Sequence, residues 1–150
     1  MKISECIAAE NVEVDLNAPS KERLLKILSE KAGRFTGVNE QDISSALQNR
    51  EKLGSTGIGS GIAIPHAPVA GLKHPFGLIV RLGKPMNFDS IDGEPVDIVC
   101  LLIFPAEGGS THLTVLSRIA RVLRVSDTVR RLRSARSKKE LYAVITQADA

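Results

Sequence analysis

The sequence predicts an α/β fold: a single domain, residues 1–150, with a mixed central β-sheet sandwiched between α-helices. Strand-like segments are interspersed with helical segments through most of the chain, and a run of helices ends it. With 43% hydrophobic and 25% charged residues, the composition is that of an ordinary globular domain. A chain of 150 residues is long enough to bury one substantial core.

The first strand and the first helix are predicted from patterning. Residues 11–16 alternate between apolar and polar side chains, as a half-buried strand does. Residues 17–20 read Asn-Ala-Pro-Ser, which is typical of a helix start, and an apolar stripe continues from there to Ala32. We expect Gly33 and Gly37 to close this helix.

A second helix is expected to begin at Asn39, a favourable N-cap residue. Its apolar stripe consists of Ile43, Ala46 and Leu47, and the position seven residues after Ile43 on that stripe is Arg50. A guanidinium at the end of a core-facing stripe either extends past the core into solvent or is aimed at an anion. The position of Arg50 on the stripe does not by itself favour either of these two interpretations.

The remaining elements follow in order. Residues 54–61, with four glycines, are predicted as a loop that precedes the short apolar segment 62–64. Residues 77–82 and 96–104 are predicted strands, and the second is apolar throughout, as in a central strand covered on both faces. The sequence then predicts three helices: one capped by Ser110 or Thr111 and running to about Arg124, a short one from Ser126, and a last one opened by a Ser137–Glu140 capping box.

The basic residues are concentrated near the C-terminus. Nine lie between Arg118 and Lys139, against one acidic residue, Asp127. Such a stretch either binds an acidic partner or nucleic acid or forms a solvated helical face. The chain has only four Phe, one Tyr and no Trp, too few rings for a single-strand stacking platform. We therefore expect no nucleic-acid partner.

Cysteine usage and the N-terminus point to the cytoplasm. Cys6 and Cys100 are too few for a disulfide framework or a four-ligand metal site, and Cys100 falls in an apolar strand. The first residues lack the layout of a signal peptide, and no apolar run approaches the length of a membrane span. We expect no membrane span, no metal and no cofactor.

Three histidines are candidates for chemistry. His74 lies in a polar turn and is expected to be exposed, whereas His112 falls in the first turn of a helix, where it can donate a hydrogen bond to an anion. His66 follows three small apolar residues and Pro65, which restrict the backbone and display the imidazole at the end of a strand. His66 is therefore the preferred nucleophile.

The surroundings of His66 indicate a place for a dianion. Gly57, Gly59 and Gly61 let the preceding segment bend and bring backbone amides close to a ligand. Together with Arg50 and His112, they predict the positioning and charge stabilisation that phosphoryl transfer needs. A metal-dependent hydrolase using His66 and His112 is a weaker alternative, because no carboxylate ligands are evident.

These residues also resemble a known family. The segments 57–66, ending in Ile-Pro-His, and 105–113, which contains His112, are similar to two motifs of the enzyme IIA domains of the bacterial phosphotransferase system, fructose/mannitol class. Residues 50–57 resemble the nitrogen-regulatory branch of that class, and the likeness covers essentially the whole chain. Mannitol-type members carry an acidic residue six positions before the active histidine, where this chain has Ser60.

The resemblance implies that His66 accepts phosphate on Nε2, that Arg50 and His112 lie beside it, and that the donor is a histidine-phosphorylated carrier protein. It implies a regulatory output through target proteins such as potassium-transport components or sensor kinases, since the chain ends at Ala150 with no room for a further transfer domain. The alternative is an enzyme IIA that passes phosphate to a separate sugar-specific IIB component in fructose/mannitol-type uptake.

Overall fold

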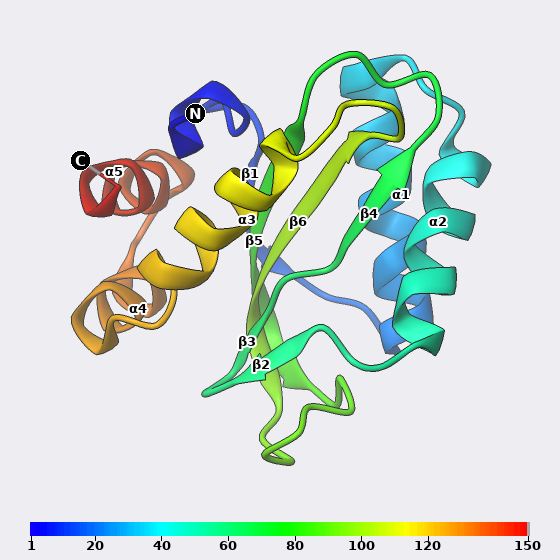
Figure 1. Cartoon of the computed structure of the whole chain (residues 1–150). Helices are drawn as coiled ribbons and strands as arrows, with labels where there is room; N and C mark the ends of the chain where they lie inside the picture. Colours follow the sequence, from blue (N-terminus) through cyan, green and yellow to red (C-terminus); the bar gives the residue numbers. More distant parts are fainter. Residues whose placement is uncertain (150) are drawn as a thin grey trace.

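A mixed β-sheet lies between two helical layers in the computed structural model, which describes residues 1–149 (Figure 1). The strands are β1 (Val12–Leu16), β2 (Gly57–Gly59), β3 (Ile62–Ala63), β4 (His66–Val69), β5 (Phe76–Met86) and β6 (Val96–Pro105). The helices are η1 (Ile3–Glu5), α1 (Lys21–Thr36), α2 (Glu40–Lys52), α3 (Thr111–Val122), α4 (Ser126–Ser134) and α5 (Lys138–Ala148). The predicted fold class is confirmed.

Strand β6 is the centre of the sheet. The strand order is β1-β5-β6-β3-β2, with β4 also pairing with β6. β6 runs antiparallel to β5 and parallel to β3 and β4. Its side chains alternate between the two faces: Ile98, Cys100 and Leu102 belong to one buried cluster, while Val99 and Leu101 belong to the other. The apolar run in the sequence therefore marks a strand covered on both faces, as predicted.

Each face of the sheet is covered by a different set of helices. Helices α1 and α2 pack on one face, and η1, α3, α4 and α5 cover the other (Figure 1). Within the described residues, no helix combines the length and the apolar character needed to cross a membrane.

Helix α1 begins as predicted and is closed by Gly37, one of the two glycines expected to close it. The hydroxyl of Ser20 caps it by accepting from Arg23 N at 3.1 Å. The helix continues through Gly33, and Gly37 closes it with a φ of 77° in the left-handed region. The expectation that Gly33 closes the helix is wrong. Gly33 instead permits close contact between α1 and the following segment, because a Cβ there would lie 3.1 Å from the carbonyl oxygen of Val38.

The glycine-rich segment is a β-hairpin and not the predicted loop. β2 pairs antiparallel with β3, and Gly59 stands opposite Ile62. The two turn residues, Ser60 and Gly61, have φ angles of 57° and 81°, as a tight hairpin turn of the primed type requires. Short strands flanked by glycines lack the apolar periodicity that would reveal them in a sequence.

Candidate functional site

His66 is held by backbone hydrogen bonds on both sides. It is the first residue of β4, opposite Leu102 of β6, and so begins a strand where the sequence suggested the end of one. Ile64 N donates to the carbonyl oxygen of Thr56 at 3.0 Å, and Leu102 N donates to that of Pro65 at 2.9 Å. Pro65 is buried and the imidazole of His66 is half-buried. The ring is thus presented from a rigid stretch of chain.

The hydrogen bond of the imidazole identifies its nucleophilic nitrogen. His66 Nδ1 lies 2.7 Å from the carbonyl oxygen of Ile64. A carbonyl oxygen can only accept, so Nδ1 carries the hydrogen and the lone pair of the neutral ring lies on Nε2. The local backbone therefore selects the tautomer that can attack an electrophile through Nε2.

The surroundings keep this imidazole neutral. Burial lowers the pKa of His66 below 6.5, and the nearby charges of Arg50 and His112 lower it further. The hydrogen bond to the Ile64 carbonyl and the carboxylate of Glu51 act in the opposite direction. At neutral pH the ring is a base with a free lone pair, as a nucleophile needs.

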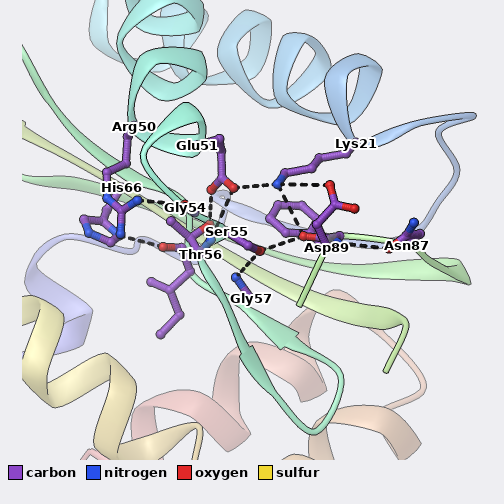
Figure 2. A network of polar contacts seen from close by, with 12 residues as sticks. Lys21, Arg50, Glu51, Gly54, Ser55, Thr56, Gly57, His66, Asn87 and Asp89 are labelled. Atoms are coloured by element: carbon purple, nitrogen blue, oxygen red, sulfur yellow. Dashed lines mark hydrogen bonds and ion pairs between the residues drawn. The ribbon is translucent and has the colours of Figure 1, made fainter. Parts of the chain in front are cut away.

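Arg50 lies in the last turn of α2, beside His66 (Figure 2). Its side chain is half-buried, and Nη1 donates to the carbonyl oxygen of Gly54 at 2.8 Å. The guanidinium is therefore anchored at one nitrogen, while its charge acts on the imidazole. The half-buried, anchored side chain does not extend freely into solvent, and its role toward an anion stays a prediction.

His112 completes the group of residues that the structure brings together. It lies in the first turn of α3, and its ring stacks on Phe104 with centroids 3.9 Å apart and an interplanar angle of 8°. Its charge also acts on His66. A cavity of about 500 Å³ lies beside His112 and is lined in part by Lys73 and His74. His74 is exposed, as predicted.

Gly59 and Gly61 lie at the turn end of the β2–β3 hairpin, away from His66. A Cβ on Gly57 would collide with the hydroxyl of Ser90, and one on Gly59 would lie 3.1 Å from Asp92. Gly61 accepts from the backbone of Ile98, four residues along β6 from the partner of His66, or about 13 Å at the usual strand rise. Gly61 is one of the two turn residues of the hairpin, and Gly59 ends β2 opposite Ile62. The expectation that these glycines bring backbone amides close to a ligand stays a prediction.

A second set of polar residues near the site was not predicted. Glu51, Thr56 and Lys21 form a connected network beside Arg50 and His66 (Figure 2). Glu51 does carry a signal in the sequence: it lies four residues after Leu47 and eight after Ile43, so it falls on the buried stripe of α2. A carboxylate on such a stripe needs a compensating partner.

Four of the nine basic side chains between Arg118 and Lys139 are in ion pairs. The pairs are Arg118 with Asp149, Arg130 with Asp127, Arg133 with Asp97 and Lys138 with Glu13. The unpaired residues of the stretch, such as Arg121, Arg124 and Arg131, are exposed. In residues 1–149, no group of three or more His, Cys, Asp or Glu side chains is placed to hold a metal ion.

A match to a protein-family model shows which family the chain belongs to. Residues 5–148 match the family described as "Phosphoenolpyruvate-dependent sugar phosphotransferase system, EIIA 2". The chain belongs to this family. As an enzyme IIA of type 2, it is a component of a phosphoryl-transfer relay, and the family resemblance seen in the sequence is confirmed.

Similar proteins and solved structures agree with this family assignment. The chain is 43% identical to a "Nitrogen regulatory protein" from Bradyrhizobium diazoefficiens over 97% of this enzyme IIA and 95% of the relative. The crystal structure of Nitrogen Regulatory Protein IIA-Ntr from Neisseria meningitidis superimposes with a TM-score of 0.91 at 34% identity, covering 96% of this chain and 99% of that one. The mannitol enzyme IIA in its complex with phosphorylated enzyme IIB, from Escherichia coli, shares the fold at a TM-score of 0.79 and 19% identity, with coverage of 93% and 96%.

Proposed function

We propose that this enzyme IIA accepts a phosphoryl group on Nε2 of His66 from a histidine-phosphorylated carrier protein. The observation that carries the proposal is the 2.7 Å contact between His66 Nδ1 and the Ile64 carbonyl oxygen, which leaves the lone pair on Nε2. The lowered pKa keeps that lone pair available at neutral pH. Arg50 and His112 supply positive or hydrogen-bonding groups for the incoming dianion.

The transfer exchanges one phosphorus–nitrogen bond for another. Nε2 of His66 attacks the phosphorus of the donor phosphohistidine, and the donor nitrogen leaves with the electron pair of the broken bond. As the bond forms, the His66 ring gains positive charge, and the Nδ1–H bond to the Ile64 carbonyl stabilises that charge. The transition state is loose, with negative charge on the peripheral oxygens, so the guanidinium of Arg50 stabilises it electrostatically.

We further propose that the phosphorylation state controls binding to regulatory target proteins in the cytoplasm, of the potassium-transport or sensor-kinase type. Support comes from the relatives named nitrogen regulatory protein. Two large apolar side chains next to site residues are exposed, Leu53 by 85% and Leu113 by 57%, and they suit a protein partner. A dianion on His66 would change the electrostatics of that surface.

A second candidate is transfer onward to a sugar-specific IIB component. The structural neighbour in complex with phosphorylated enzyme IIB favours it. The two candidates differ in output: a relay enzyme transfers label to a IIB protein, whereas a regulator retains it and changes its affinity for a target.

The experiment is phosphorylation from labelled phosphoenolpyruvate with enzyme I and the carrier protein. We expect an acid-labile, base-stable phosphate on the wild type and on His74→Ala, whose histidine is exposed. We expect none on His66→Ala. Full labelling of His66→Ala would refute the assignment.

A further inference from the structure

Glu51 is a buried carboxylate in the residue after Arg50. Its side chain is only 7% exposed. Oε2 lies 2.7 Å from Nζ of Lys21 and accepts from Thr56 N at 3.2 Å, while Oε1 accepts from the hydroxyl of Thr56. A charge removed from water to this degree is tolerated only with such compensation, so the arrangement is specific to a carboxylate.

The network leads from Glu51 to the imidazole. Thr56, which Glu51 holds by both its amide and its hydroxyl, accepts from Ile64 N at 3.0 Å through its own carbonyl oxygen. The carbonyl oxygen of Ile64 then accepts from His66 Nδ1 at 2.7 Å. Three consecutive hydrogen bonds therefore connect the Glu51 carboxylate with the ring nitrogen that fixes the tautomer (Figure 2).

The same network holds the anchor of the guanidinium. Arg50 donates to the carbonyl oxygen of Gly54, in the short segment between α2 and Thr56. The next residue, Ser55, donates through its hydroxyl to the carbonyl oxygen of Phe88 at 2.6 Å, and Lys21 Nζ lies 3.3 Å from that oxygen. The segment is thus fixed at Gly54 by Arg50, at Ser55 by Phe88 and at Thr56 by Glu51.

We propose that Glu51 is a positioning residue for phosphoryl transfer, which holds Arg50 and His66 in their relative places through Thr56. The inference rests on the proposed function of His66. Glu51 takes no part in bond making, and Lys21 supplies the counter-charge that allows a carboxylate to be buried there. Outer-shell partners of this kind affect reaction rates because small misplacements of reacting groups are costly.

The charge of Glu51 also affects the pKa of His66, and this effect can be measured separately from the transfer rate. The charges that act on the pKa of His66 are those of Arg50 and His112, which lower it, and Glu51, which raises it. Removal of the Glu51 charge must therefore lower the pKa of His66 further, whereas a purely structural defect would move it toward its ordinary value of 6.5 as the ring becomes exposed.

The test compares Glu51→Gln with Glu40→Gln, the same substitution at the exposed start of the same helix. For Glu51→Gln we expect the transfer rate from the phosphorylated carrier to fall by about tenfold or more, with the KM for the carrier within about twofold. We also expect a weaker Nδ1–H signal of His66 in nitrogen-15 NMR and a lower titration midpoint. Glu40→Gln should match the wild type in transfer rate, KM for the carrier, Nδ1–H signal and titration midpoint.

Wild-type transfer and an unchanged Nδ1–H signal in folded Glu51→Gln would overturn the proposal. If this variant does not fold, Thr56→Val carries the test, since it removes only the hydroxyl contact to Glu51. There we expect about a threefold slower transfer, and an unchanged rate would equally overturn the proposal. Labelling of His66→Ala would instead refute the proposed function, so the two failures are distinguishable.

Discussion

Replacement of Arg50 by glutamine measures what the guanidinium contributes to transfer. The side chain donates to Gly54 at 2.8 Å and is half-buried, so part of its charge is screened by water. Loss of one preorganised donor in a closed site costs about 2.7–4 kcal/mol of transition-state stabilisation. With the partial exposure of Arg50, we expect about 2 kcal/mol, or roughly a thirtyfold slower transfer.

The assay is rapid-quench transfer of phosphate from the labelled carrier at pH 8, where His66 is neutral in both proteins. The pH matters because the Arg50 charge lowers the pKa of His66, so Arg50→Gln must raise it and would slow the reaction at pH 6 for that reason alone. Arg50→Lys keeps the charge but not the planar fork, and we expect an intermediate rate. Transfer by Arg50→Gln within twofold of wild type at pH 8 would refute this role.

Further predictions concern pH, backbone packing and ring stacking. The rate of wild-type labelling should decline at acid pH with a midpoint below 6.5, because protonation of His66 removes the lone pair and its pKa lies under that value; a midpoint above 6.5 would contradict the burial argument. Gly57→Ala should lower the free energy of unfolding by about 1–3 kcal/mol in urea titrations, since the new methyl group meets the Ser90 hydroxyl. Phe104→Ala should lower the free energy of unfolding by about 3–5 kcal/mol in urea titrations. It should also slow phosphoryl transfer, because the ring that stacks on His112 is lost.

The architecture was predictable where local signals are strong. The apolar run of β6, the Ser20 and Asn39 caps and the Ser137 cap all occur where patterning placed them. Even there, tertiary detail differs: Glu140 accepts from Arg136 N at 2.9 Å and not from Ser137 N, so only half of the expected capping box forms. Short strands and exact helix ends were missed because glycine serves turns and close packing equally.

The candidate site was also predictable in part: the sequence indicates its main residues but not the contacts that position them. His66, Arg50 and His112 are each marked by an unusual local setting, and the fold brings them together. The tautomer of His66 depends on the carbonyl oxygen of Ile64, whose own amide donates to Thr56, and Thr56 donates in turn to Glu51. Such a chain of contacts depends on how α2 and residues 56–66 are placed against each other, which the pattern of a single segment does not encode.

The most direct test of the central claim is to locate the phosphate by phosphorus–nitrogen NMR on nitrogen-15-labelled protein after a reconstituted relay. The tautomer set by Ile64 requires the phosphorus to couple to Nε2 of His66, with Nδ1 still protonated. Coupling to Nδ1 of His66, or to a ring nitrogen of His74 or His112, would contradict the account.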